Sequence, residues 1–299
     1  MRRVLEYLCL SLCLGLLALP APAAVVHEVF SAYHHIQVRD EAGLRILSFN
    51  GSQETRMSLL NHLEGHFDYT EYFHLPIILN PGLSNVLMIG LGGGSTQRAY
   101  AYYYPRVRVD TVEIDPEVVV IARRFFGVLE SPQHRIHVAD GRVFLRRNPT
   151  RYDALLMDAY QTGRYGSDAP HHLVTQEFFQ LAATNLTPNG VLMYNVIGTL
   201  GGWKADRVGA LYRTMKTVFP HVYWFAAENS LNVVLLGTKS REPLTLPALR
   251  QKYEEQRKRQ VLMPPSLAVR INAFRTNVPP AAARAPLLTD KYVPPTALR

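Results

Sequence analysis

Cysteine is nearly absent from this sequence of 299 residues, since Cys9 and Cys13 are the only two. Both lie in the first 23 residues, which have the features of an export signal. Removal of this signal would leave no thiol, and so would exclude a disulfide, a thiolate metal site and a cysteine nucleophile from the mature chain. The sequence also lacks an internal repeat and a dense basic tract.

The stretch Met1–Ala24 has two arginines near its start, an apolar run over Leu8–Leu19 and small residues before an expected cleavage site at Ala23. We expect residues 1–23 to be a signal peptide and the mature protein to be exported to the periplasm. The apolar run is short for a bilayer span, so no stable membrane insertion is expected after cleavage. The alternative is a protein anchored in the inner membrane by an uncleaved leader.

The net charge of the chain is positive, but its Arg and Lys residues are scattered along the sequence. The formal net charge is +8, and it falls to about +7 when two arginines and one glutamate leave with the signal. The densest basic run, Arg250–Arg259, also contains Glu254 and Glu255, which is typical of a solvated helix. We therefore expect no nucleic-acid partner.

The order of apolar segments predicts an α/β fold. From Asn85 onward, short apolar runs alternate with helical patterns, as in a doubly wound parallel sheet. The expected strands are Val86–Ile89, Val107–Ile114, Ile136–Ala139, Ala154–Asp158, Val191–Val196, Val222–Ala226 and Asn232–Gly237. Five parallel strands followed by a hairpin are typical of a Rossmann-like, seven-stranded sheet of the S-adenosylmethionine-dependent methyltransferase type.

Three parts are expected after the signal: a small β-rich domain over residues 24–80, the Rossmann-like domain over residues 81–240, and a C-terminal helix with a proline-rich tail over residues 241–299. In the first part we predict a hairpin of His34–Arg39 and Leu44–Phe49, then helices over Leu59–His66 and Tyr69–Ile78. In the last part, residues 279–285 read as a linker and residues 287–292 as a segment that folds back. The histidines of the first part do not have metal-ligand spacing, so no metal is expected.

A glycine-rich segment follows the first strand of the Rossmann-like domain. Gly90, Gly92, Gly93 and Gly94 allow a tight turn and close approach of a ligand to the backbone. Ser95 or Thr96 would cap a helix that runs to Tyr104. Glu113 ends the next strand about twenty residues later, where a carboxylate accepts the hydroxyl groups of a ribose. This order predicts a nucleoside site, and the alternative is a structural turn.

Two more acids follow strands and should lie at the same edge of the sheet. Asp140, followed by Gly141, could accept a hydrogen bond from an adenine amino group, or it could cap the next helix. Asp158 closes the run Ala154–Met157, where partial burial raises a carboxylate pKa and suits a base or a cation-binding group. The alternative for Asp158 is a loop acid or helix cap.

Several of these motifs together resemble the spermidine synthase (polyamine aminopropyltransferase) family. They are Leu87–Thr96, Val112–Pro116, Asp140-Gly141, Tyr152–Asp158 and the helix around Glu177-Phe178-Phe179, with Ser31–Ile36, Tyr69–Leu75 and Leu288-Thr289-Asp290 outside the sheet. The resemblance spans residues 32–237. It implies transfer of an aminopropyl group from decarboxylated S-adenosylmethionine to a small-molecule amine. A related enzyme would use S-adenosylmethionine instead. The resemblance also implies a homodimer and no metal.

The resemblance also implies roles for single residues. It assigns Glu113 to the ribose, Asp140 with Gly141 to the adenine, the loop glycines to the donor, and Asp158 to deprotonating or orienting the amine. Tyr72 matches a tyrosine of the family's amine pocket, and Gln161 and Asp168 lie where the amine would bind.

The chain departs from the family at three positions. Gly93 replaces an aspartate that holds the donor's ammonium group, Gln161 replaces a second acid of the catalytic loop, and His34 replaces a glutamine. Asp168, Glu71 or Asp68 could compensate for the lost acids. The sequence therefore leaves three hypotheses open: a spermidine synthase-like aminopropyltransferase with a degraded amine site, a methyltransferase, or a non-catalytic nucleoside- or polyamine-binding protein.

Overall fold

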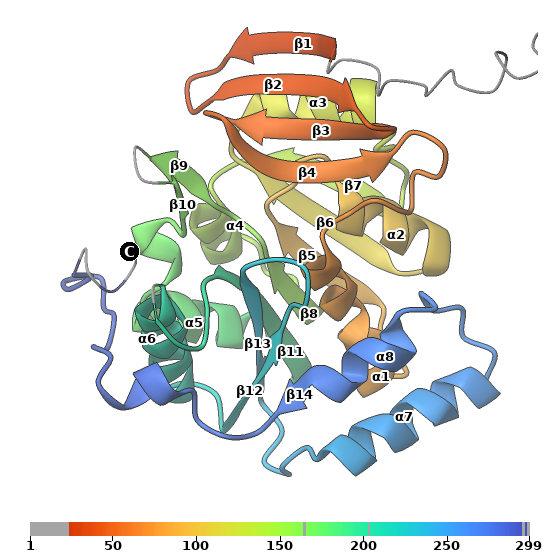
Figure 1. Cartoon of the computed structure of the whole chain (residues 1–299). Coiled ribbons are helices and arrows are strands. Elements are labelled where there is room, and N and C mark those ends of the chain that lie inside the picture. Colours follow the sequence, from red (N-terminus) through yellow and green to blue (C-terminus); the bar gives the residue numbers. More distant parts are fainter. Residues whose placement is uncertain (1–23, 164–165, 203, 295–296, 298–299) are drawn as a thin grey trace, which may run out of the picture.

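A computed structural model describes residues 24–163, 166–202, 204–294 and 297. The predicted signal peptide lies outside these residues. Figure 1 shows a small antiparallel sheet above a larger sheet that carries helices on both faces. Within the described part of the chain, no helix is long and apolar enough to cross a membrane.

The small sheet contains four strands in sequential antiparallel order: β1 (Ala24–Phe30), β2 (His35–Glu41), β3 (Leu44–Phe49) and β4 (Ser52–Ser58). The predicted hairpin is therefore present, and β1 and β4 extend it on its two sides. The helix predicted over residues 59–66 is wrong, because this segment forms turns. Side-chain oxygens of Ser58 and Asn61 accept backbone N–H groups there, in competition with a helix.

The large sheet has the order β14-β12-β13-β11-β8-β5-β6-β7. Its strands are β5 (Asn85–Ile89), β6 (Arg108–Glu113), β7 (His134–Val138), β8 (Tyr152–Met157), β11 (Leu186–Ile197), β12 (His221–Ala226), β13 (Asn232–Thr238) and β14 (Phe274–Arg275). β5, β6, β7, β8 and β11 are parallel, and β13 is antiparallel to both β11 and β12. This confirms the predicted methyltransferase-type sheet, to which the short β14 adds an eighth strand at the β12 edge.

Helices cover both faces of the large sheet. One face carries α4 (Gly141–Arg147), α5 (Gln176–Thr184) and α6 (Ala205–Lys216), and the other carries η1 (Asp68–His74), α1 (Leu75–Leu79), α2 (Ser95–Tyr103), α7 (Leu246–Lys258) and α8 (Leu267–Arg270). β5 shows why the strands are apolar throughout. Leu87 and Ile89 point to the first face and Val86 and Met88 to the second, as the two-residue repeat of a strand requires.

α3 (Pro116–Phe126) joins the two sheets, because its apolar residues pack against the inner side of the small sheet while the helix also contacts β6 and β7. Asp115 caps this helix by accepting the N–H of Glu117 at 3.0 Å, and Gly127 ends it with a φ of 68°. The small sheet is thereby held over the carboxyl ends of the parallel strands (Figure 1).

The C-terminal region is packed on the body. Residues 280–283 form a 3₁₀ turn against α6, where a Cβ atom at Gly209 would lie 2.7 Å from the carbonyl carbon of Ala281. The segment predicted as a linker is therefore part of the packed structure. Leu288 is completely buried, and Asp290 forms an ion pair with Arg142 at 2.6 Å, so the tail folds back as predicted.

Candidate active site

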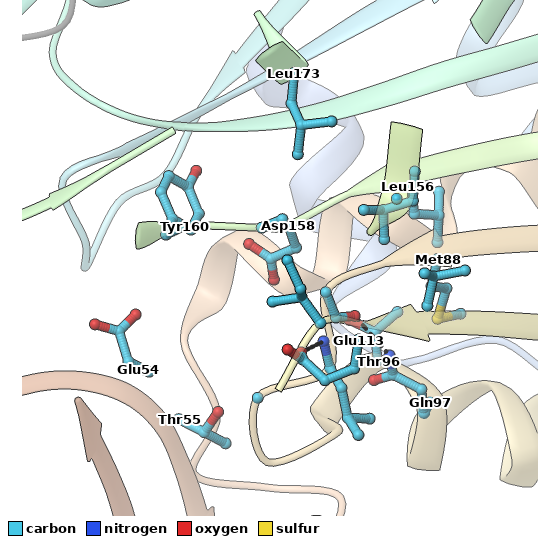
Figure 2. A pocket seen from close by; sticks show the side chains of 18 of the residues that line it. Glu54, Thr55, Met88, Thr96, Gln97, Glu113, Leu156, Asp158, Tyr160 and Leu173 are labelled. Atoms are coloured by element: carbon cyan, nitrogen blue, oxygen red, sulfur yellow. Dashed lines mark hydrogen bonds between the residues drawn. The ribbon is translucent and has the colours of Figure 1, made fainter. Parts of the chain in front are cut away.

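A cavity opens at the carboxyl ends of β5, β6, β7 and β8, beneath the small sheet. Glu113, Asp140 and Asp158 all line it, so the structure brings together the three acids selected from the sequence. The empty space, including the part open to solvent, is about 1100 Å³. Figure 2 shows Glu113 and Asp158 on neighbouring sides of this space.

Glu113 ends β6 and is held by the backbone. One carboxylate oxygen accepts the N–H of Leu91 at 2.9 Å, and the other accepts the N–H of Asp115 at 3.0 Å. Burial raises the pKa of Glu113 above its usual value, and these two hydrogen bonds oppose that shift. Each oxygen keeps a further lone pair for a ligand hydroxyl group.

The glycine loop serves both the cavity and the packing around it. Gly90 has a φ of 100°, and a Cβ atom there would lie 2.2 Å from the backbone oxygen of Asp158, so only glycine fits. Gly90 and Gly92 line the cavity, whereas Gly93 and Gly94 do not. The N–H of Gly93 donates a hydrogen bond to the Thr55 hydroxyl oxygen at 2.9 Å. This arrangement does not support ligand contacts for Gly93 and Gly94.

The predicted helix cap in this loop is also wrong. α2 begins at Ser95 after Gly94, which is the N-cap residue in a left-handed conformation, and neither Ser95 nor Thr96 caps the helix. Both residues line the cavity instead. The first turn of α2 therefore faces the site where a ligand would bind.

Asp140 caps the next helix and also lines the cavity, so its position is compatible with both of the roles considered from the sequence, the helix cap and the contact with an adenine. One of its oxygens caps α4 by accepting the N–H of Val143 at 2.8 Å, and the other lies 2.8 Å from His172 Nε2. The residue is also part of the cavity wall. Gly141 lets α4 approach the sheet, because a Cβ atom there would lie 2.5 Å from Ile89 Cγ2.

Asp158 follows β8 directly and is held by two side chains from elsewhere in the chain. Tyr69 Oη donates to one carboxylate oxygen at 3.0 Å, and Asn195 Nδ2 donates to the other at 2.9 Å. Burial raises the pKa of Asp158 from 3.8 to about 6, although both hydrogen bonds act to lower it. A carboxylate with this pKa is ionised at neutral pH and can accept a proton from a bound group.

Tyr72 was predicted in the amine pocket, but it does not line the cavity. It is completely buried, and its hydroxyl donates to the backbone oxygen of Ala226 at 2.8 Å. Tyr69 lines the cavity in its place. The two tyrosines are one turn apart in η1, and one turn of 3₁₀ helix advances about 6 Å, so only one of them can reach Asp158.

The acids expected to compensate for Gly93 and Gln161 are engaged elsewhere. Asp168 forms an ion pair with Arg207, Glu71 forms one with Arg270, and Asp68 accepts the backbone N–H groups of residues 228 and 229. Gln161 is exposed in β9 (Gln161–Gly163), which pairs with β10 (Gly166–Asp168). Neither Gln161 nor Asp168 lines the cavity, so this arrangement does not support their predicted contacts with an amine.

Five side chains of the site were not predicted from the sequence. These are Glu54, Thr55, Tyr69, Tyr160 and Asn195: four line the cavity, and Asn195 holds Asp158 from behind. Only Tyr69 had a signal, because it lies in the segment that resembles the family. His34 was identified as a departure, and it too lines the cavity, with its ring stacked on Phe49 at 4.4 Å.

The charge of the cavity is opposite to that of the chain. Four carboxylates line it, from Glu54, Glu113, Asp140 and Asp158, together with His34 and His172. No Lys or Arg is found among the described residues that line it. Among all the residues that the structure describes, no group of three or more His, Cys, Asp or Glu side chains could hold a metal ion. The cavity therefore suits an organic cation with hydroxyl groups.

Comparisons with known proteins agree with this fold. Two solved structures share the fold. A spermidine synthase in complex with the transition-state analogue AdoDATO has a TM-score of 0.65 and 21% identity, over 85% of this chain and 84% of the other. The human methyltransferase-like protein 13 in complex with SAH has a TM-score of 0.57 and 26% identity, over 64% of this chain and 91% of the other.

Sequence comparison gives the family. The polyamine aminopropyltransferase of Vibrio vulnificus is 32% identical over 289 residues, which cover 93% of this chain and 92% of that protein. The family model of the spermine/spermidine synthase domain matches residues 66–227, which include η1, the glycine loop and all three acids found at the strand ends. The chain therefore belongs to the spermine/spermidine synthase family of polyamine aminopropyltransferases.

Proposed function

We propose that this protein transfers an aminopropyl group from decarboxylated S-adenosylmethionine to a primary amine such as putrescine. The observation that supports the proposal is the cavity itself, which is lined by the backbone-held acid Glu113 and by Asp158 and has no Lys or Arg among its described lining residues. Both proposed substrates are cations, and such a wall attracts them.

The nucleoside part of the donor would bind along the strand ends. Glu113 would accept the ribose hydroxyl groups through the lone pairs that Leu91 and Asp115 leave free. Asp140 would accept the adenine amino group beside the N-terminus of α4. The sulfonium group of the donor would then face Asp158.

The reaction needs one bond to form and one to break. The lone pair of the neutral amine nitrogen attacks the methylene carbon next to the sulfonium, the carbon–sulfur bond breaks, and its electrons stay on sulfur as methylthioadenosine leaves. Asp158 takes a proton from the amine, and Tyr69 and Asn195 hold its two oxygens in position. Attack in line with the leaving sulfur is the geometric requirement.

Methyl transfer from intact S-adenosylmethionine is the second candidate, and the likeness to the human methyltransferase-like protein favours it. The intact donor carries an additional carboxylate. The acidic cavity wall, without Lys or Arg among its described residues, gives that carboxylate no cationic partner. This difference is why we place aminopropyl transfer first.

The test is release of methylthioadenosine from decarboxylated S-adenosylmethionine and putrescine, measured by chromatography with the full chain. We expect turnover, and we expect Asp158→Asn to lower it by about 10²–10⁴-fold, the usual contribution of a general base. The matched control is Asp206→Asn, an exposed acid in the first turn of α6, which should leave turnover unchanged.

Other outcomes separate the alternatives. Methyl transfer from intact S-adenosylmethionine to any acceptor would select the second candidate. Binding of methylthioadenosine or spermidine in a calorimeter, without turnover of any diamine, would contradict the proposal and leave a non-catalytic binding protein.

A further inference from the structure

Glu54 occupies an irregular position in β4. In the pairing of β3 with β4, Leu47 lies opposite Thr55 and Ser48 lies opposite Gln53, so Glu54 is the extra residue of a β-bulge. Neighbouring residues of a regular strand point to opposite faces, but a bulge redirects a side chain. As a result, both Glu54 and Thr55 line the cavity.

The carboxylate of Glu54 lies half-buried in the cavity without a cationic partner. It accepts hydrogen bonds from Ser167 Oγ at 2.9 Å and from the Ser52 side chain, and none of the described Lys, Arg or His residues forms an ion pair with it. In Figure 2, Glu54 and Asp158 direct their carboxylates into the same space, with Tyr160 beside them. Burial raises the pKa of Glu54, and the charge of Asp158 adds to this shift.

Two carboxylates that share a desolvated space repel each other unless a cation lies with them. The other acids near this end cannot take up that cation, because Asp168 and Glu71 are paired with arginines and Asp68 is bound by backbone N–H groups. Glu54 and Asp158 are therefore the two acids at this end of the cavity wall that have no cationic partner among the described residues.

The surroundings of Gly93 explain why the second acid comes from β4. A Cβ atom at position 93 would lie 2.7 Å from Thr55 Cγ2 and 2.9 Å from Phe126 Cδ1. Thr55 thus fills the space that an aspartate at position 93 would need. The bulge places Thr55 against the glycine loop, and it also places the Glu54 carboxylate at the cavity wall next to Thr55.

We propose that Glu54 binds a primary alkylammonium group in the cavity, opposite Asp158, and so replaces the carboxylate that Gly93 lacks. This inference rests on the proposed function, because it names the group that the site recognises. The ammonium can belong to the aminopropyl chain of the donor or to the far end of a diamine acceptor. Donor and acceptor both present a primary ammonium group. They can be distinguished because the KM of only the substrate that contacts Glu54 would depend on this residue.

The variant Glu54→Gln keeps the size and the hydrogen-bonding capacity of the side chain and removes its charge. We expect the KM of one substrate to rise by about tenfold or more, since a charge-assisted hydrogen bond becomes a neutral one. A rise in the KM of decarboxylated S-adenosylmethionine places the donor's ammonium at Glu54, and a rise in the KM of putrescine places the acceptor's there. Affinity for methylthioadenosine, which has no ammonium group, should not change.

The matched control is Glu28→Gln in β1 of the same sheet, where the carboxylate is exposed and contacts His35. It should leave both KM values unchanged. Glu54→Asp keeps the charge on a shorter side chain and should recover part of the loss. Thermal unfolding of each variant shows whether the fold is retained.

Failure of Glu54 to bind an ammonium group can be distinguished from a lack of aminopropyl transfer. If the wild-type protein turns over and Glu54→Gln has wild-type KM values for both substrates, Glu54 does not bind ammonium. If the wild-type protein does not turn over, calorimetric affinities for putrescine and spermidine replace the KM values. Equal affinities in the wild type and Glu54→Gln, or no amine binding at all, would then overturn the inference.

Discussion

The two ends of the cavity are built in different ways. At the end proposed to bind the nucleoside, Glu113 ends a parallel strand and Asp140 follows another. Both are positioned by backbone N–H groups, either within three residues or, for Leu91, in the loop after the neighbouring strand β5. At the end proposed to bind the amine, which we call the amine end, Asp158 is surrounded by side chains from β4, η1 and β11, which are far apart in the sequence. The first end is a property of the strand-loop-helix motif, and the second is a property of the tertiary structure.

The strongest test of this difference is Glu113→Gln. One carboxylate oxygen becomes an NH₂ group that must face the N–H of Leu91 or Asp115, so a hydrogen bond is lost and the loop is displaced. We expect affinity for methylthioadenosine to fall by about 10–100-fold, as for loss of hydrogen bonds to a charged group. Titration calorimetry measures this change.

The control for this variant is Glu117→Gln, which alters a partly exposed acid in the first turn of α3. Its affinity for methylthioadenosine should stay within about twofold of the wild type, since surface changes are usually small. Unchanged affinity in Glu113→Gln would show that the nucleoside, if it binds, does not use this acid.

The same difference explains how much of the site the sequence could predict. Glu113, Asp140 and Asp158 each end an apolar run, and parallel strands bring such positions to one edge of the sheet, so their convergence followed from the pattern alone. The fold of residues 85–238 was predictable for the same reason. The strand bounds differ from the predicted ones most at the start of β11, which begins at Leu186 and was predicted to begin at Val191.

The amine end could not be predicted in this way. Glu54 lies in a strand whose register depends on a bulge, and a shift of one residue reverses the face to which a side chain points. Tyr69 and Tyr72 lie one 3₁₀ turn apart, and the sequence does not show which of them is level with the strand ends. The formal charge of +8 was no guide either, because the cavity wall is acidic.

Burial of Asp158 makes the stability of the folded protein depend on pH. The pKa of Asp158 is raised to about 6 in the folded protein, above its value of 3.8 without burial. The folded state therefore binds this proton more tightly than the unfolded state, and the group destabilises the protein increasingly as pH rises from about 4 to about 6. Above pH 6 the cost stays constant.

Asp158→Asn removes this cost, because the introduced amide can accept from Asn195 and donate to the oxygen of Tyr69. We expect the variant to be more stable than the wild type by about 1–3 kcal/mol at pH 7.5, with a much smaller gain at pH 4. Urea unfolding at several pH values measures the difference. Equal stability of the two proteins at all pH values would show that Asp158 is not desolvated.

The smallest expected effects separate the two tyrosines of η1. Tyr69→Phe removes the hydrogen bond to the Asp158 carboxylate, and we expect aminopropyl transfer to fall by about tenfold and the free energy of unfolding to fall by about 1.5 kcal/mol, the lower end of the contribution of a hydrogen bond to a charged group. Tyr72→Phe removes the buried hydrogen bond to Ala226, and we expect a loss of about 1 kcal/mol in the free energy of unfolding with transfer unchanged. Each tyrosine variant is the control for the other. If Tyr72→Phe slows transfer and Tyr69→Phe does not, the amine would bind on the Tyr72 side of η1, and the boundary between the two ends of the cavity would have to be redrawn.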